Sequence, residues 1–412
     1  MKLFQVDTLA TARQKLLAAM EEMGKKALLQ ENIPFSKAAG RILAKDFRAP
    51  EPLPAFARAT VDGYAVRAVD TQGAGESLPV FLTIVDEVHI GETAATAIGP
   101  GECAYVPTGG MLPPGADAMV MIEHSELFDA THVALYQAVA YGRDVVFPGE
   151  DVRQGDLVLP AGSRLEFGAL GALAALGLTT VPVWQPLRLS IISTGDELVP
   201  AECKPNCGQI RDINTYALRA LAERAGFFVV RTRVLQDEEP LLREALQEAM
   251  HDSDIIAVSG GSSQGKKDMT GRLMDEVASP GLFTHGLALK PGKPTILAKD
   301  IASGTLLVGL PGHPAAALMV FHLLLVWLWE TLCGVAPQLP LTAELETNLP
   351  AAPGRLTCQP VMLIEKDGKL LARPVLGKSA LITTVARADG YLIIEGEREG
   401  LPQGALVQVY RW

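Results

Sequence analysis

The chain has 412 residues, of which 48% are hydrophobic and 20% charged, and its net charge is −11. This length favours about two to four domains, and the composition is typical of soluble proteins with well-formed cores. The acidic excess argues against a nucleic-acid-binding protein, because affinity for nucleic acid depends on many basic contacts to phosphate. An anionic ligand would have to meet a local cluster of lysine, arginine and backbone N–H groups.

The five cysteines are scattered and odd in number, which argues against a disulfide framework. Cys203 and Cys207 form a close pair, and we expect an ordinary reduced loop there rather than a zinc site. The N-terminus shows no pattern of a cleavable signal. The apolar stretch 314–333 is long enough to span a membrane, but it contains His322 and Glu330, so we expect a buried helix. Cytoplasmic localisation without a membrane partner is therefore expected.

The N-terminal part of the chain is predicted to contain short elements of both kinds. Leucines and alanines at three- and four-residue spacing predict a helix over residues 8–30, and a second helix is predicted over 36–43. Residues 48–56 are too rich in proline for either regular element and are predicted to form a linker or extended arm. Short alternating runs between Gly/Pro turns predict a small β domain within 78–139, and a helix is predicted over 166–176.

Strands and helices alternate after Pro186. Strands are predicted at 187–193, 227–235, 254–259, 295–298 and 305–309, and helices at 214–225, 239–250, 269–278 and 314–333. Such alternation implies parallel strands with right-handed crossovers. After Gly334, short alternating strands predict a small C-terminal β domain, which we expect to be a barrel.

The predicted fold class is α/β plus β, in an elongated multidomain chain with a central parallel α/β domain and a C-terminal β barrel. The predicted domains are an N-terminal helical and β linking region formed by 1–52 and 142–185, a small β domain over 53–141, the α/β domain over 186–334 and the barrel over 335–412.

Three loops rich in glycine or proline follow three of the predicted strands. They contain Ser193, Thr194, Gly195 and Glu197 in the first, Ser259, Gly260 and Gly261 in the second, and Pro311, Gly312, His313 and Pro314 in the third. Ligands bind at the carboxyl edge of parallel α/β sheets, where such loops meet. Glycines let the backbone approach a ligand, and the third loop opens a helix whose free N–H groups favour anions. We therefore expect a site for an anionic, phosphate-bearing ligand, although turns and helix caps alone would also explain each loop.

Charged residues in nearby loops extend this interpretation. Lys290 and Lys293 lie in a stiff loop with three prolines or glycines, which presents two ammonium groups at low entropic cost. Asp268 is predicted near a helix start, where it could hold Mg²⁺ or simply cap the helix. Asp62 and Asp151 are distant in sequence from the α/β block. They could reach its site only by folding back or from a second subunit.

Seven of these segments occur in the same order as in a known family. They are VDGYA at 61–65, PTG at 107–109, GED at 149–151, STGDEL at 193–198, SGG at 259–261, KPGKP at 290–294 and GLPGHP at 309–314. In this set the chain resembles the molybdopterin molybdenumtransferase family, the type of bacterial MoeA and of the gephyrin E-domain.

The resemblance implies a function and a set of roles. It implies an elongated four-domain homodimer that inserts molybdate into adenylylated molybdopterin, with Mg²⁺ as cofactor and release of AMP. It implies site residues of the β domain and its neighbour that act across the dimer, namely Asp62, Thr108 and Asp151. It also implies that Glu197, Asp237 and Asp268 are acids of the α/β site and that some of them bind Mg²⁺. It implies that the loops with Lys290, Lys293, Pro311 and Pro314 face the anion, and that Ser379 of the C-terminal domain contributes to the site.

The chain departs from the family pattern at several positions. The pattern leads us to expect Lys at Gly286, Asn at His313, Ser at Ala316 and an arginine near Pro360, and residues 59–61 and 262–265 also differ. Loss of a charged hydrogen bond costs about 1–3 kcal/mol, so these changes could weaken oxyanion capture without affecting the fold. Two alternatives to the transferase thus stay open. One is a molybdopterin-binding carrier or scaffold with weakened catalysis, and the other is a nucleotide pyrophosphatase.

Overall fold

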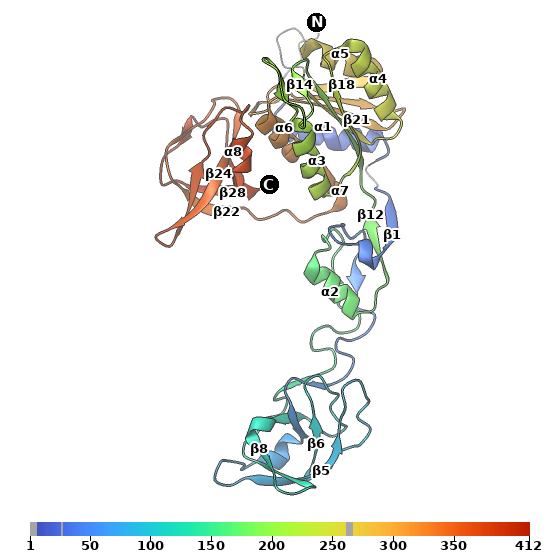
Figure 1. Ribbon diagram of the computed structural model, residues 1–412, viewed down its shortest axis with the longest axis vertical. Helices are drawn as coiled ribbons and strands as arrows, with labels where there is room; N and C mark the ends of the chain where they lie inside the picture. The colour runs from blue at the N-terminus through green and yellow to red at the C-terminus, as the bar shows by residue number, and fades with distance from the viewer. Residues whose placement is uncertain (1–5, 26–27, 261–266) are drawn as a thin grey trace.

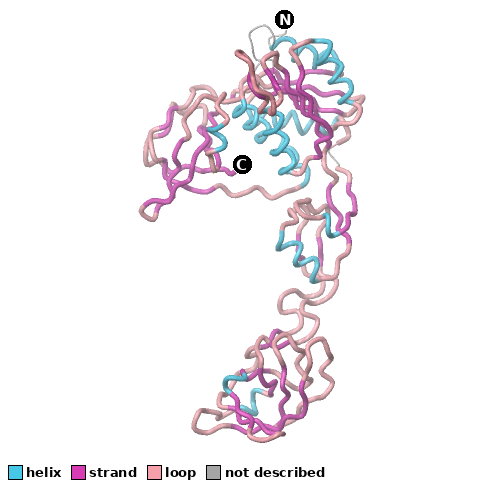
Figure 2. Tube along the Cα trace, viewed as in Figure 1, coloured by secondary structure: helices cyan, strands magenta, loops and turns pink. Residues whose placement is uncertain are grey.

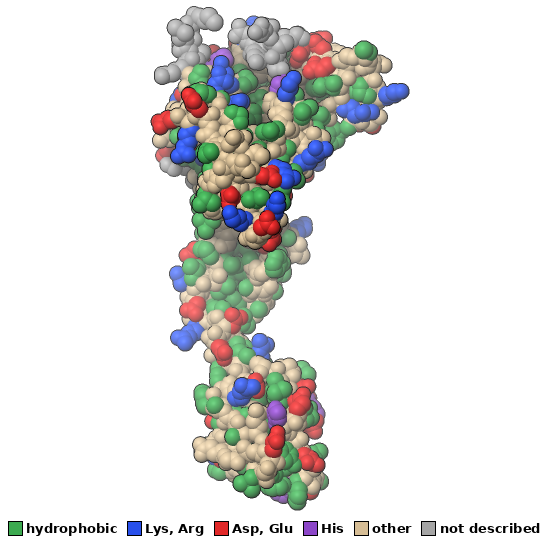
Figure 3. Space-filling model, turned by 90° about the vertical axis from the view of Figure 1, so that its left-hand side faces the viewer, with side chains coloured by type: hydrophobic (Ala, Val, Ile, Leu, Met, Phe, Trp, Pro, Cys, Tyr) green, Lys and Arg blue, Asp and Glu red, His purple; other side chains and the backbone are tan. Residues whose placement is uncertain are grey.

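The structure is a computed structural model that describes residues 6–25, 28–260 and 267–412, without the side chains of residues 267 and 268. The chain is elongated (Figure 1), with an α/β unit and a β barrel side by side at one end and a small β unit at the other. A middle unit joins the two ends through a neck that is mostly loop (Figure 2). Hydrophobic side chains are prominent over this middle unit on the face shown in Figure 3.

The α/β unit is built on a six-stranded sheet. Its strands, in spatial order, are β16 (Phe228–Leu235), β13 (Arg188–Thr194), β17 (Ile255–Gly260), β21 (Thr305–Leu310), β20 (Ile296–Asp300) and β18 (Pro280–His285). The first four are parallel, as predicted, but β20 and β18 are antiparallel to their neighbours. The sequence-based expectation of a wholly parallel sheet was wrong here, because β20 and β21 are joined by a short turn rather than a crossover helix. Strand β18 was not predicted.

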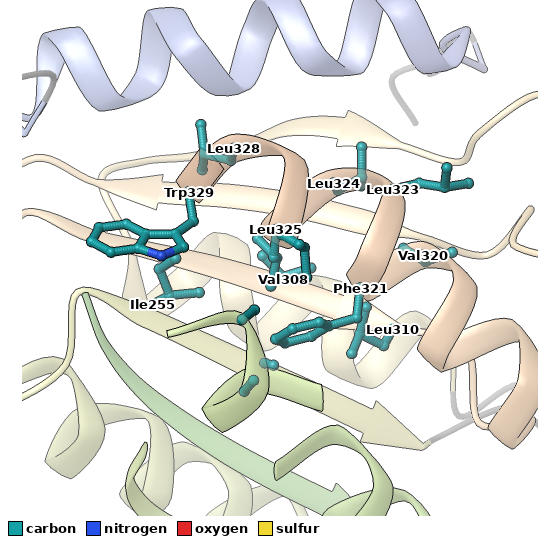
Figure 4. Close-up of a cluster of buried hydrophobic side chains, with 14 of the residues drawn as sticks. Ile255, Val308, Leu310, Val320, Phe321, Leu323, Leu324, Leu325, Leu328 and Trp329 are labelled. Carbon is teal, nitrogen blue, oxygen red and sulfur yellow. The ribbon is translucent and has the colours of Figure 1, made fainter. Parts of the chain in front are cut away.

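Helices cover both faces of this sheet. One face is covered by α4 (Glu239–Met250) and α5 (Lys267–Val277). The other is covered by α3 (Asn214–Ala225) and by a long helix made of α6 (Pro314–Phe321), a π-helical turn (His322–Val326) and α7 (Trp327–Cys333). Figure 4 shows Phe321, Leu325 and Trp329 of this long helix among side chains of β17 and β21.

The long helix is also the one helix of the described residues that is apolar and long enough to cross a membrane. Within the structure, however, 72% of the most apolar 18-residue stretch of this helix is buried. Trp329 and Phe321 are among the largest fully buried side chains of the chain. Its apolar sequence is therefore explained by its place at the centre of the largest core, as expected for a buried helix.

The N-terminal helix α1 (Leu9–Glu22) packs into this same core through Ala12, Leu16 and Met20. The predicted helix over 8–30 was too long. It ends at Glu22, and Gly24 then adopts a left-handed φ of +70°, which is typical of helix termination. The helix predicted over 36–43 is absent. A single 3-10 turn (Phe35–Lys37) forms instead, because residues 42 and 43 form bridges with residues 164 and 183.

The middle unit consists of two small antiparallel pairs and one helix. β1 (Gln30–Pro34) pairs with β12 (Thr180–Trp184), and β2 (Phe47–Arg48) pairs with β11 (Leu157–Leu159). The helix α2 (Phe167–Ala175) buries Leu173 against them. Two distant stretches of chain thus run through this unit together on the way to and from the small β unit.

The small β unit contains a six-stranded sheet. Its strands, in spatial order, are β7 (Ala118–Met121), β4 (Gly63–Val66), β6 (Glu102–Val106), β5 (Val80–Glu87), β9 (His132–Leu135) and β8 (Ser125–Leu127). A short ladder between β3 (Arg58–Ala59) and β10 (Val145–Val146) closes its end next to the neck. The Asp62 and Thr108 loops lie at this end, because β4 begins at Gly63 and β6 ends at Val106.

The C-terminal unit is a closed five-stranded barrel, as expected. Around the barrel the strands are β24 (Leu356–Lys366), β25 (Lys369–Pro374), β22 (Leu341–Leu345), β28 (Leu406–Arg411) and β26 (Gly390–Ile394), and β26 pairs again with β24. A strand of the α/β unit, β19 (Leu289–Lys290), adds to β24 in parallel register. The barrel is therefore joined to the lysine loop by main-chain hydrogen bonds.

Candidate functional site

Three of the predicted ligand loops meet at one edge of the sheet. β13, β17 and β21 are adjacent and parallel, so their carboxyl ends lie side by side. Thr194 is in register with Gly260, and Ser259 is in register with Leu310, which precedes Pro311. The described loop residues are therefore neighbours, whereas Gly261 lies outside the described residues.

Gly260 is required by this close packing. Its φ is +135°, and a Cβ there would lie 2.1 Å from the carbonyl oxygen of Thr194 and 2.5 Å from Thr194 Oγ1. Any side chain would force the main chains of β13 and β17 apart, because the obstructing atom is backbone. The glycine therefore lets the two strands end at nearly the same point.

Buried hydroxyl and amide groups connect the three loops. Ser193 Oγ lies 2.8 Å from Thr215 Oγ1, where either can donate. Asn214 Nδ2 donates to Ser259 Oγ at 2.6 Å and to the carbonyl oxygen of Gly312 at 2.9 Å. Ser193 and Ser259 are each 1% exposed, so this network is shielded from bulk water. It fixes the start of α3 against the ends of β13, β17 and β21.

Several buried polar atoms of this network lack a partner. Thr194 Oγ1, Asp212 Oδ2 and Asn214 Oδ1 are buried and form no hydrogen bond with any residue that the structure describes. Buried polar groups are nearly always hydrogen-bonded, so such atoms gathered in one place indicate that water or a ligand completes them. Asp212, Asn214 and Thr215 were missed by sequence reasoning. An Asp directly before the α3 pattern was the available signal, since Asp212 Oδ1 accepts from the Thr215 N–H at 3.2 Å, as a capping residue does.

Acidic side chains lie on two adjoining loops. The Asp237 N–H donates to Asp196 Oδ1 at 3.0 Å. Glu197 is exposed, and its carboxylate folds back over Gly195, where a Cβ would lie 2.9 Å from Glu197 Oε2. The predicted acids Glu197 and Asp237 thus lie on neighbouring loops at the carboxyl edge. The side chain of Asp268 lies outside the described residues.

A metal centre is not evident from geometry alone. Within the described part of the chain, no three His, Cys, Asp or Glu side chains form a cluster that could hold a metal ion. The assignment of Glu197, Asp237 and Asp268 as metal ligands therefore stays a prediction. Cys203 and Cys207 are exposed and form no disulfide with each other.

The lysine loop lies between α6 and the barrel. Lys290 and Lys293 are both exposed. Gly292 has a φ of +129°, and a Cβ there would lie 2.7 Å from Val320 Cγ2 of α6, so the loop packs closely on that helix. The two ammonium groups are therefore carried by a stretch whose main chain is held on both sides.

The barrel reaches the start of α6 through Ser379. His313 Nδ1 lies 2.8 Å from Ser379 Oγ, and the Ala315 N–H donates to the Ser379 carbonyl oxygen at 3.1 Å. Pro314 is the first residue of α6, and Pro311 is buried beside it. Two residues predicted from distant parts of the chain, His313 and Ser379, are thus in direct contact.

Asp62 and Thr108 form a separate pair in the small β unit. Asp62 Oδ1 accepts from the Thr108 N–H at 2.7 Å and from Thr108 Oγ1 at 2.9 Å, and these hydrogen bonds lower the pKa of Asp62. Asp151 is exposed in the neck, and its N–H donates to the Leu53 carbonyl oxygen at 3.1 Å. Within one chain this end of the molecule is remote from the α/β unit (Figure 1), so the structure does not bring Asp62, Thr108 and Asp151 to the carboxyl edge.

Comparisons with known proteins agree with this architecture. Family models match residues 8–177 (MoeA N-terminal region, domain I and II), 190–331 (probable molybdopterin binding domain) and 342–412 (MoeA C-terminal region, domain IV). The molybdopterin molybdenumtransferase of Bacillus subtilis is 32% identical over 92% of this chain and 89% of its own length.

Two crystal structures of molybdopterin biosynthesis MoeA proteins from Pyrococcus horikoshii also match. One is 34% identical with a TM-score of 0.75, over 98% of both chains. The other is 28% identical with a TM-score of 0.79, over 98% of this chain and 100% of its own. Since identity above 30% extends over nearly the whole length of both chains, this protein belongs to the MoeA family.

Proposed function

We propose that this chain is a molybdopterin molybdenumtransferase of molybdenum cofactor biosynthesis, which inserts molybdate into adenylylated molybdopterin with release of AMP. One observation carries the proposal. Unpartnered buried oxygens of Thr194, Asp212 and Asn214 gather where three glycine- or proline-rich loops meet, next to the lysine loop and the start of α6. Such an arrangement suits a ligand that carries both phosphate and hydrogen-bond donors.

The proposed reaction places two requirements on these residues. A phosphoric anhydride is cleaved, so negative charge that develops on phosphate must be offset by nearby donors. A tetrahedral oxyanion must also be held, for which Lys290, Lys293 and the positive dipole end of α6 are suitable. The remaining contribution of the protein is positioning, because holding the two substrates in the reactive orientation removes a large part of the activation free energy.

Magnesium is the expected cofactor, and the residues present fit it. Mg²⁺ prefers carboxylate oxygens and usually keeps several waters while it binds substrate phosphate. Glu197, which is exposed, and Asp237, on the neighbouring loop, supply such oxygens at the same edge. When bound, the ion would neutralise charge on the phosphates of the substrate.

A homodimer would complete the site. Asp62 and Thr108 lie in the small β unit and Asp151 in the neck, and the small β unit is remote from the α/β unit of the same chain (Figure 1), so these residues reach a carboxyl-edge site only if it belongs to a second copy. We expect that mixing two inactive variants, Asp62→Asn and Gly260→Ala, restores activity to about a quarter of wild type, because mixed dimers carry one intact site each. Mixtures that stay inactive would contradict a shared site.

The activity is tested directly by measuring AMP. Purified protein is incubated with adenylylated molybdopterin, Mg²⁺ and molybdate, and AMP is quantified by chromatography. AMP release that requires both molybdate and Mg²⁺ is expected. A protein that binds the pterin yet releases no AMP above background would refute the transferase. Cytoplasmic localisation is proposed with this function, since the substrates named here are intermediates of cofactor biosynthesis.

A carrier or scaffold with weakened catalysis is the second candidate. It is favoured by Gly286, which has no side chain where lysine is expected, and by Ala316, which is 3% exposed and has no hydroxyl. Each replacement removes a possible contact to an oxyanion. Tight binding of molybdopterin without molybdate-dependent AMP release would support this candidate over the transferase.

A further inference from the structure

The lysine loop rises from a base in which its two ends are joined by main-chain hydrogen bonds. The Gly286 N–H donates to the Thr295 carbonyl oxygen at 2.7 Å, and the Leu287 N–H donates to the Lys293 carbonyl oxygen at 2.9 Å. Just beyond this base, β19 pairs with β24 of the barrel. The ammonium groups of Lys290 and Lys293 are exposed, so their positions depend on how firmly this base is held.

Residue 7, from the other end of the chain, completes this base. Asp7 forms a parallel bridge with Leu287, which is fully buried. The Asp7 N–H donates to the Gly286 carbonyl oxygen at 3.1 Å, and the Ala288 N–H donates to the Asp7 carbonyl oxygen at 2.8 Å. The segment 286–288 is thus held by residue 7 as well as by the far end of the loop.

The side chain of Asp7 fixes residue 7 in turn. Asp7 is 8% exposed, and its Oδ2 accepts from Thr284 Oγ1 at 2.7 Å and from Lys15 Nζ at 2.7 Å. Thr284 lies in β18 and is buried, whereas Lys15 lies in α1 and also donates to the Phe283 carbonyl oxygen at 3.1 Å. Charge-assisted hydrogen bonds of a carboxylate are stronger than neutral ones, and their loss leaves a buried group unsatisfied. The carboxylate therefore ties the base of the lysine loop to a strand and a helix of the α/β unit.

We propose that Asp7 is a positioning residue for oxyanion capture, because it fixes the main chain that presents Lys290 and Lys293. This inference rests on the proposed function, in which these two lysines hold the oxyanion. Asp7 is not itself a contact to the oxyanion, because its carboxylate is buried and held by Thr284 and Lys15, and its negative charge would repel an anion. Its effect on capture passes through the main chain of residues 286–288.

Kinetics on the full chain separate positioning from general stability. Asp7→Ala should raise the KM for molybdate about tenfold with little change in the KM for adenylylated molybdopterin, because the two lysines are displaced while the pterin loops are not. Asp7→Asn keeps an oxygen acceptor for Thr284 and should recover part of this loss. Thr284→Val, which removes one donor without opening a cavity, should raise the KM for molybdate in the same direction.

Asp300→Ala is the matched control. Asp300 is 6% exposed and accepts from the Ser279 and Ser303 N–H groups, so its replacement also removes a buried carboxylate with its hydrogen bonds. It lies at the end of β20 away from the lysine loop, where it pairs with Thr305 at the start of β21. We expect Asp300→Ala to lower the free energy of unfolding and to leave both KM values unchanged.

Hydrogen exchange, followed by mass spectrometry without any substrate, tests the inference independently of turnover. Peptides that cover residues 286–295 should exchange about tenfold faster in Asp7→Ala than in wild type, and as in wild type in Asp300→Ala. Unchanged exchange in Asp7→Ala would overturn the inference whether or not the protein releases AMP, and so would an unchanged KM for molybdate. A wild-type protein that releases no AMP would overturn the proposed function, whereas the exchange result would still decide whether Asp7 fixes the loop.

Discussion

His322 makes the contact between the long helix and the barrel sensitive to pH. Its ring packs edge-on against Tyr391 at 5.6 Å and Trp412 at 5.8 Å, both in the barrel. Burial, and after it the positive charges of Arg224 and Arg13, lower the pKa of His322 to about 4. The Arg13 guanidinium donates to the Leu323 carbonyl oxygen at 2.8 and 3.0 Å, so this positive charge is held close to the ring.

The sign and size of the effect follow from the two pKa values. Above pH 6.5 the imidazole is neutral in both states, and its contribution to stability is complete. As the pH falls, the unfolded chain takes up a proton near pH 6.5 whereas the folded chain does so only near pH 4, so stability is lost between these values. These values correspond to a loss of about 2 kcal/mol between pH 7 and pH 5 from this one group.

The assay is urea unfolding followed by tryptophan fluorescence at pH 7 and pH 5. All four tryptophans lie in or against the core that contains the long helix, so the signal reports on this junction. We expect His322→Phe to lose about 2 kcal/mol less than wild type over this range, because it keeps the aromatic contacts without the charge. His89→Gln, at an exposed histidine of the small β unit, is the matched control and should behave like wild type. Equal losses in His322→Phe and wild type would refute the reasoning.

Three further predictions concern the candidate site. Gly260→Ala should lower the free energy of unfolding, measured in urea, by at least about 2 kcal/mol, and it should abolish AMP release, because the new Cβ would meet the main chain of β13. Gly171→Ala, whose Cβ would lie in open space, is the control and should not destabilise the chain. Ser379→Ala should weaken the binding of adenylylated molybdopterin several-fold, measured by calorimetry, with little change in the free energy of unfolding, and Ser379→Thr should restore the affinity. An unchanged affinity in Ser379→Ala would show that the barrel does not take part in the site. Asp62→Asn should abolish AMP release without changing the unfolding midpoint. Because hydrogen bonds lower the pKa of Asp62, this carboxylate should produce no acid limb in the wild-type pH profile above about pH 4.

The elements with strong periodicity were predictable from the sequence. The helices 214–225 and 239–250 were predicted with the bounds that the structure has, because each has an unbroken apolar face and a clear stop, such as Gly226 at φ +104°. The three strand-to-loop transitions were also correct, since continuous apolar runs end there in glycine or proline. Strand β18 was missed because its six residues carry no alternating pattern that separates it from the preceding turn.

The buried part of the candidate site was less predictable. Sequence reasoning found the loops but not Asn214, because its importance comes from contacts with residues 45 and 98 positions away along the chain. Partners at such separations leave no local pattern. For Asp62, the sequence showed only its distance along the chain from the α/β block, and it left folding back and a second subunit both open. The sequence also could not show the hydrogen bonds between Asp62 and Thr108.

The departure at Gly286 has a structural explanation that bears on both candidate functions. Gly286 has a φ of +100°, its N–H donates to the Thr295 carbonyl oxygen at 2.7 Å, and its own carbonyl accepts from the Asp7 N–H at 3.1 Å. This backbone conformation is strained for lysine, so Gly286→Lys would not simply restore a missing cation. The change from the family pattern is therefore built into the main chain, through its pairing with the N-terminal segment. Under the proposed function, Lys290 and Lys293 hold the oxyanion in this loop without a third lysine at position 286. A variant that removes either lysine should therefore weaken capture more than the same change would in a site with lysine at that position.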